Sequence, residues 1–183
     1  GDQYARFADR ILVHDARNDE MVYLGVSKNG TEMYLNKQGV GFEKILIIGS
    51  VEPHYFAGYT GGRKGLLPGI ASYRTIEQNH KHALSPKAST LALEGNPVHE
   101  DMIDALKVVK NRLFSIMTVL DKHQEIYAVT SGDIHEAFYG AVEKANEVFV
   151  APIAEKVDVV VSCAKYPMDV DLYQAQKAIE NAK

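Results

Sequence analysis

The sequence has 183 residues, 46% of them hydrophobic, which suffices for one ordinary globular domain or for one domain and the start of another. Its 20 basic and 24 acidic residues give a formal net charge of -4, so no global charge attracts nucleic acid or an anionic membrane. The single cysteine, Cys163, excludes an internal disulfide framework, and no apolar stretch approaches the roughly 18 residues that span a bilayer. Because residues 1–7 also lack the features of a secretory signal, we expect a cytoplasmic protein.

The first half of the chain predicts a hairpin followed by a buried strand. Residues 5–17 have too weak a pattern to separate a short helix from an irregular segment. Residues 21–26 and 32–35 nearly alternate apolar and polar side chains around Asn29-Gly30, a pair suited to a tight hairpin turn. Residues 44–51 are continuously apolar and rich in β-branched side chains, which predicts a central strand buried on both faces of a parallel sheet.

The second half alternates predicted strands and helices. A helix beginning at Asn96-Pro97 and running through Val109 places its apolar side chains on one face. Two strand patterns, at 113–120 and 126–130, precede a helix that runs to about Val148. This order predicts an α/β fold with a doubly wound, largely parallel sheet and flanking helices. A further buried-strand pattern at 156–162 and a helix from about 171 to the end complete the chain.

A polar, glycine-rich stretch, residues 52–65, follows the predicted central strand, and the carboxyl ends of such strands are where open α/β sheets bind ligands. Its glycines would let the backbone approach a ligand closely, and Arg63 and Lys64 add positive charge that favours a phosphate or carboxylate. The spacing fits neither a Walker A loop nor a dinucleotide-binding motif. An ordinary glycine-rich turn with solvated basic side chains explains these residues equally well. The glycines concerned are Gly58, Gly61, Gly62 and Gly65.

Reactive side chains are unusually dense in this window, which holds His54, Lys64, His80 and His82 beside several aromatic residues. Surface loops seldom combine histidine, lysine and aromatic side chains in this way. A lone histidine is more often a hydrogen-bonded structural residue than a ligand or base. That interpretation applies to His14, His82, His99, His123 and His135.

Residues 54–70 read His-Tyr-Phe-Ala-Gly-Tyr-Thr-Gly-Gly-Arg-Lys-Gly-Leu-Leu-Pro-Gly-Ile, and residues 75–80 read Thr-Ile-Glu-Gln-Asn-His. This stretch closely resembles the nickel-dependent lactate racemase family of 2-hydroxyacid racemases and epimerases. The resemblance continues through Gly-Asn-Pro-Val-His at 95–99, Tyr-Pro-Met-Asp at 166–169 and Tyr-Gln-Ala-Gln-Lys at 173–177. It therefore covers the chain from about Gly25 to the end.

The resemblance implies a cofactor, the nickel-pincer nucleotide, which is pyridinium-3,5-bisthiocarboxylic acid mononucleotide carrying nickel. Lys64 matches the lysine that attaches this nucleotide through a thioamide in the best-known members, and a crowded lysine can lose its proton and act as a nucleophile. His80 matches the single histidine that binds nickel beside the carbon and two sulfurs of the cofactor. A neutral imidazole suits such a square-planar nickel(II) site.

The resemblance also implies roles around the substrate. His54 matches one of two family histidines that exchange the substrate's hydroxyl proton while hydride moves between the α-carbon and the cofactor. Tyr173 and Lys177, spaced i and i+4 on one helix face, match a tyrosine and a lysine that contact substrate or cofactor anions, and Gln174 is a further candidate. Phe56, like Tyr59, is a candidate to pack against the pyridinium ring, or equally a core residue.

Two family features are not visible in this sequence: the arginine that binds the substrate carboxylate and the second catalytic histidine. We therefore expect residues 1–155 to be a cofactor-binding α/β domain that lacks the family's N-terminal part, and 156–183 to begin a second α/β domain. Such a chain would be a fragment, catalytically incomplete without the other parts of the same protein. Its expected small-molecule partner is a 2-hydroxyacid, with lactate, malate, aromatic 2-hydroxyacids and sugar acids all open.

Two alternative functions remain open from the residues. The first is a non-catalytic module that binds a nucleotide or phosphate through residues 61–65. The second is a scaffold with degenerate sites, which the joint presence of His54, Lys64 and His80 disfavours.

Overall fold

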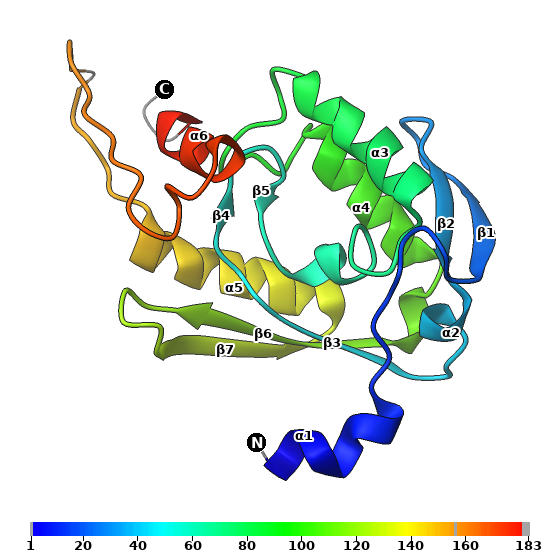
Figure 1. Ribbon diagram of the computed structural model, residues 1–183. Helices are drawn as coiled ribbons and strands as arrows, with labels where there is room; N and C mark the ends of the chain where they lie inside the picture. The colour runs from blue at the N-terminus through cyan, green and yellow to red at the C-terminus, as the bar shows by residue number, and fades with distance from the viewer. Residues whose placement is uncertain (1, 156, 181–183) are drawn as a thin grey trace.

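The computed structural model describes residues 2–155 and 157–180, in which the largest sheet has three strands and is covered on one face by a long helix (Figure 1). The sheet has the order β3 (Ile45–Ser50), β6 (Leu113–Leu120) and β7 (Ile126–Gly132). β3 and β6 are parallel, whereas β6 and β7 form an antiparallel hairpin. The predicted α/β class is confirmed, and the sheet is mixed.

β3 does not occupy the central, doubly buried position predicted from its composition. Among the described strands it pairs only with β6, so it lies at an edge of the sheet. Ile47 faces the core at 8% exposure, whereas Leu46 and Ile48 are 52% and 67% exposed on the opposite face. Successive side chains of a strand point to opposite faces, so an apolar run is buried throughout only where both faces are covered. In the described residues α5 (Ile134–Phe149) covers one face of the sheet.

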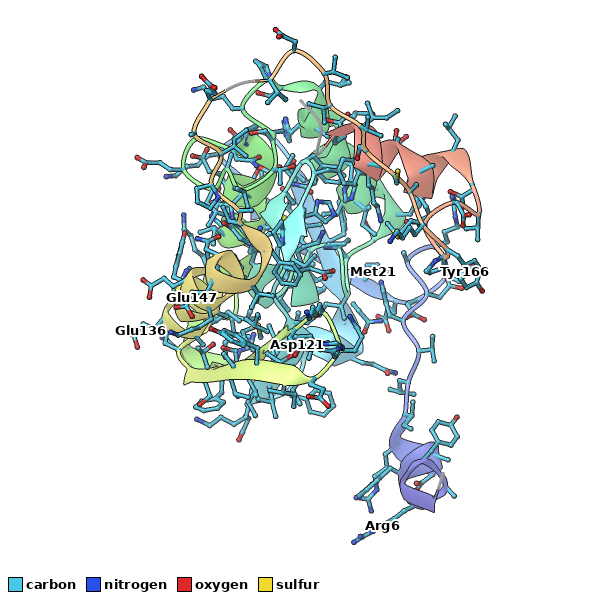
Figure 2. The ribbon with its side chains drawn as sticks, turned by 90° about the vertical axis from the view of Figure 1, so that its left-hand side faces the viewer. Arg6, Met21, Asp121, Glu136, Glu147 and Tyr166 are labelled. Atoms are coloured by element: carbon cyan, nitrogen blue, oxygen red, sulfur yellow. The ribbon has the colours of Figure 1, made fainter. Side chains whose placement is uncertain are left out.

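The two long helices confirm their predictions. α4 (Pro97–Lys107) begins at Asn96, whose side chain accepts hydrogen bonds from the backbone N–H groups of the first turn. α5 (Ile134–Phe149) is capped in the same way by Asp133. Glu136 and Glu147 lie on the solvent face of α5 (Figure 2). The buried faces of the two helices carry Val98, Met102, Ala105, Leu106, Ala137, Phe138, Ala141 and Ala145.

The predicted hairpin is also confirmed, as β1 (Met21–Val26) and β2 (Glu32–Asn36). Gly30 has a φ of 89° in its turn. α2 (Lys37–Val40) follows β2, and α3 (Tyr73–Lys81) packs against the hairpin. The undecided N-terminal segment forms α1 (Asp2–Phe7) and the 3-10 turn η1 (Ala8–Arg10), and α1 extends away from the rest of the chain (Figures 1 and 2).

The strand predicted at 156–162 does not form. Lys156 lies outside the described residues, and Val157, Val159 and Val161 are 61%, 77% and 84% exposed without regular structure. A strand needs a neighbouring strand for its backbone hydrogen bonds, and these residues have no such neighbour in the described chain. The predicted last helix is present as α6 (Leu172–Glu180). Across the described residues no helix is both long and apolar enough to cross a bilayer.

Candidate cofactor and active site

The glycine-rich stretch follows the carboxyl end of β3, as predicted. β4 (Pro53–His54) pairs with β5 (Gly58–Tyr59) in a short antiparallel ribbon, so residues 55–57 form its tip. The 3-10 turn η2 (Gly62–Gly65) follows and packs against β3, α4 and α5. A second 3-10 turn, η3 (His82–Leu84), continues α3, and η4 (Lys110–Arg112) leads into β6.

The glycines of this loop approach protein atoms. Gly61 has a φ of 76°, and a Cβ there would lie 2.7 Å from the carbonyl oxygen of Ser50. Gly62 has a φ of 52°, and its Cβ would meet the Phe138 ring at 2.8 Å. Glycine is therefore required for the loop to pack on β3 and α5. The interpretation of these glycines as a ligand cradle is not needed to explain them.

Arg63 points into the protein rather than toward a ligand. Its side chain is 1% exposed and lies over the Phe138 ring, 4.3 Å from the ring centroid. Burial lowers the pKa of Arg63 to about 9, so the guanidinium remains charged at neutral pH. The sequence pattern predicts that this charge faces an anion, and the structure corrects that prediction. Its guanidinium donates hydrogen bonds to the backbone carbonyls of Ala57, Tyr59, Thr60 and Gly61.

Phe56 lies at the centre of the predicted site residues. Its ring centroid is 4.6 Å from that of His54 and 5.1 Å from that of His80, in edge-to-face geometry with both. The Lys64 Nζ lies 6.0 Å from the same centroid. We call these four residues the Phe56 cluster. The structure thus brings together three side chains that the sequence placed 10 and 16 residues apart.

His80 is oriented by its own helix. Its Nδ1 lies 2.9 Å from the carbonyl oxygen of Ile76, one turn earlier in α3. A carbonyl can only accept, so Nδ1 carries the proton and donates it, which leaves the lone pair of Nε2 available. Burial lowers the pKa of His80 and so favours the neutral ring. Metal-binding histidines are commonly held in this way, with the second ring nitrogen bonded to a carbonyl.

His54 has the opposite hydrogen-bond arrangement. Its Nδ1 accepts a hydrogen bond from the backbone N–H of Ala57 at 3.2 Å, so the neutral ring carries its proton on Nε2. Burial, followed by the positive charges of Lys64 and Arg63, lowers the pKa of His54 to about 3. The ring is therefore neutral at physiological pH.

Lys64 has an environment that favours the neutral amine. Burial, then the charges of Arg63 and Lys177, lower the pKa of Lys64 to about 8, and only Glu52 opposes the shift. An ordinary lysine has a pKa near 10.4. A substantial fraction of Lys64 is therefore unprotonated at neutral to mildly alkaline pH.

α6 brings the C-terminal candidates to the same region. Lys177 donates a hydrogen bond from Nζ to the Gln174 side-chain carbonyl at 2.7 Å, and its charge lowers the pKa of both His54 and Lys64. The side chain of Tyr173 lies outside the described residues, so its predicted role stays a prediction. A cavity of about 620 Å³ opens beside His54. Its lining includes Glu52, His54, Tyr55, Thr60, Leu91, Phe149, Met168 and Lys177.

The histidines interpreted as structural lie outside the Phe56 cluster. His99 is 4% exposed beside Tyr139, and His82 lies 3.3 Å from the carboxylate of Asp101. His14 bonds to the carbonyl oxygen of Ala71. Within the described chain no three His, Cys, Asp or Glu side chains come together as a metal site. The inward direction of Arg63 was not predicted, and its place among Gly61, Gly62 and Gly65 is the sequence signal that could have indicated it.

Comparison with known proteins connects this geometry to one family. Residues 1–91 match the family model for the lactate racemase N-terminal domain. The chain is 36% identical over 174 residues to a lactate racemase of Thermoanaerobacterium thermosaccharolyticum, covering 93% of this chain and 41% of that protein. It is 35% identical over 179 residues to a lactate racemase of Lactiplantibacillus plantarum, covering 96% and 42%.

Solved structures agree with the sequence comparison. The lactate racemase apoprotein from T. thermosaccharolyticum superposes with a TM-score of 0.76 at 33% identity, over 90% of this chain and 40% of that one. A Thermotoga maritima protein at 21% identity shares the fold, with a TM-score of 0.62 over 74% of this chain and 38% of its own. The chain thus spans about two fifths of the length of the curated relatives it matches. Over that span, the chain belongs to the lactate racemase family.

Proposed function

We propose that this chain forms the cofactor-binding part of a nickel-dependent 2-hydroxyacid racemase. The observation that carries the proposal is the geometry of His80, whose Nδ1–H is bonded to Ile76 and whose Nε2 is left with a lone pair beside Phe56. A single histidine is too small a donor set for a metal site built from protein alone. It suits a site whose other ligands come from a cofactor.

The residues present fit the nickel-pincer nucleotide. His80 would bind nickel through Nε2, and Lys64 would attach the nucleotide through Nζ. Attachment is a condensation of the amine with a thiocarboxylic acid: the N–C bond forms, and one water leaves with its oxygen from the acid and one hydrogen from each partner. When bound, the cofactor would supply a hydride acceptor beside the α-carbon of the substrate. Phe56 would support one wall of the site, because it is 8% exposed and contacts both histidine rings.

His54 and Lys177 would act on the substrate. The Nδ1 of His54 is occupied by the Ala57 N–H, so proton exchange with the substrate oxygen is left to Nε2. His54 and Lys177 line the same cavity, where the lysine charge suits a carboxylate or a cofactor phosphate. Gln174 would hold the Lys177 side chain in place. Tyr173 remains a candidate for the same anion.

The division of the chain at about residue 156 is also a proposal. Residues 1–155 would hold the cofactor, and 156–183 would begin a second domain whose helix α6 returns to the site. Support comes from Lys177, which acts electrostatically on both His54 and Lys64. The substrate stays a small 2-hydroxyacid, and complete catalysis would need parts of the protein outside this chain.

A phosphate-binding module is less well supported. That alternative needed residues 61–65 to offer backbone N–H groups and two basic side chains to a ligand. In the structure Gly61 and Gly62 pack on protein atoms, and Arg63 is buried. Only Lys64 of this loop remains available for an anion.

Mass spectrometry of the chain, expressed in a host that makes the cofactor, tests the proposal. We expect a covalent adduct on Lys64, no adduct in Lys64→Arg, and an adduct without nickel in His80→Ala. Lys81→Arg, one residue beyond His80 and exposed, is the matched control that should keep both adduct and nickel. An unmodified Lys64 in a chain stabilised by phosphate alone would favour the binding module instead.

A further inference from the structure

Arg63 is a buried cation whose four hydrogen-bond acceptors are all backbone carbonyls and none a carboxylate. The acceptor oxygens of Ala57 and Tyr59 lie 2.6 and 2.8 Å from one guanidinium nitrogen. Among the residues that the structure describes, the Nε atom has no hydrogen-bond partner. A buried charge normally has an ion partner, because removing it from water is costly. Carbonyl dipoles solvate a cation but carry no net charge, so a guanidinium bonded only to carbonyls keeps a positive potential around it.

One group exposed to that field is the next residue, Lys64. The carbonyl contacts of Arg63 close residues 57–61 into a compact loop, and this loop fixes where the Lys64 side chain begins. Lys64 then extends to 6.0 Å from the Phe56 centroid. Guanidinium suits this position because it stays charged when buried and because one planar group donates hydrogen bonds to several carbonyl oxygens.

We propose that Arg63 is a positioning residue for Lys64, one that shapes the loop and disfavours the protonated amine, so that Lys64 presents a nucleophilic lone pair. The inference deepens the proposed cofactor attachment and rests on it for its biological purpose. An ammonium has no lone pair and cannot attack a carbonyl carbon. Burial lowers the pKa of Lys64 most, and Arg63 is the next cause and the largest among the charges, which agrees with this role.

Other groups act on Lys64 from neighbouring elements and must be separated from Arg63. Lys177 in α6 adds a second positive charge, and Glu52 before β4 opposes both. Two further titratable neighbours, His54 in β4 and His80 in α3, are kept neutral by burial and so add little charge at pH 7. Arg63 is the fixed charge within the same turn.

The test is the pH dependence of Lys64 labelling in the 183-residue chain. Trace acetic anhydride is added between pH 6 and 11, and peptide mass spectrometry follows Lys64 against the exposed Lys122 as the reference for reagent strength. We expect a wild-type midpoint of about 8. In Arg63→Gln, which keeps a hydrogen-bond donor without the charge, the midpoint should rise by about one pH unit, which is about tenfold less neutral amine at pH 7. In Arg112→Gln, which removes another arginine bonded to backbone carbonyls, the Lys64 midpoint should stay low.

Three results would overturn the inference. The first is a wild-type midpoint equal to that of Lys122. The second is an unchanged midpoint in Arg63→Gln with a native near-ultraviolet circular dichroism spectrum. The third is a rise in Arg112→Gln as large as in Arg63→Gln. If Arg63→Gln does not fold, Arg63→Met, which removes the charge with an unbranched apolar side chain, takes its place in these comparisons.

The labelling needs no cofactor, so it separates this inference from the proposed function. A low midpoint that depends on Arg63, without any cofactor adduct on Lys64, would contradict the proposed function alone. An adduct on Lys64 with an ordinary midpoint would contradict the inference alone.

Discussion

The Phe56 and His80 rings pack edge to face, with their centroids 5.1 Å apart and an interplanar angle of 71°. The same ring meets His54 at 4.6 Å. The Phe56 backbone is in turn fixed from α4, because the Asn96 side chain donates a hydrogen bond to its carbonyl oxygen at 2.9 Å. One buried aromatic side chain therefore sets the relative position of the two histidines.

Phe56→Ala should lower both stability and nickel retention. Removing a buried phenylalanine costs about 3–5 kcal/mol, and the cavity releases both histidine rings. Phe56→Leu keeps most of the volume and should cost less, so it separates packing from edge-to-face contact. Urea unfolding and nickel content per chain measure the two effects. Equal nickel content in folded wild type and Phe56→Ala would show that Phe56 does not position His80.

Replacing a glycine of the loop by alanine should destabilise the chain, whereas the same change in a helix should not. Gly62→Ala places a Cβ at 2.8 Å from the Phe138 ring at a φ of 52°, so we expect destabilisation of about 1–3 kcal/mol. The matched control is Gly140→Ala in α5, where the new Cβ makes ordinary contact at 3.5 Å with Thr130. That change should stabilise the chain by about 0.5–1 kcal/mol, because alanine is the better helix former. Opposite shifts in thermal unfolding temperature would support the packing role, and equal shifts would contradict it.

Much of the fold follows from the sequence because local signals dominate there. Asn96-Pro97 and Asp133 mark helix starts, and Asn29-Gly30 marks the hairpin, since capping and turn residues act over a few positions. Such local signals could not predict the edge position of β3 or the absence of a strand at 157–162. Whether an apolar run is buried depends on which elements cover it, and that is a tertiary property.

The same distinction between local and tertiary information applies to the candidate site. The family resemblance indicated His54, Lys64 and His80, but only the structure shows that Phe56 joins them and that Arg63 turns inward. A sequence gives the charge of an arginine without its direction. The hydrogen-bond partners of the two histidines likewise come from the fold, because one is a helix carbonyl and the other a loop N–H.

Because His99 is buried as a neutral ring, we expect the chain to lose stability in mild acid. Burial, then the charges of Arg63 and His135, lower the pKa of His99 to about 3, and the unfolded value is near 6.5. Between these values the unfolded chain binds a proton that the folded chain does not, so stability falls as pH decreases from 6.5 toward 3. From pH 6.5 to pH 5, His99 alone should account for about 2 kcal/mol.

Urea unfolding of wild type and His99→Gln at these two pH values measures that contribution. The variant should lose less stability on acidification, whatever its stability at pH 6.5. His123→Gln, an exposed position, is the control and should keep the wild-type slope. Equal pH slopes in all three proteins would contradict the assignment of His99 as a buried neutral ring.

The racemase reaction itself should be slow in this chain alone. The chain spans 41% of its Thermoanaerobacterium relative, and the family resemblance assigns the second catalytic histidine and the carboxylate-binding arginine to motifs that we do not find in it. Loss of one general base typically lowers a rate by about 10²–10⁴-fold. We therefore expect the cofactor-loaded chain to retain nickel but to racemise lactate at least about 100-fold more slowly than the full-length relative prepared in the same host. A chiral assay normalised to nickel content makes this comparison. Comparable turnover would show that the Phe56 cluster, with His54 as its base, suffices for catalysis.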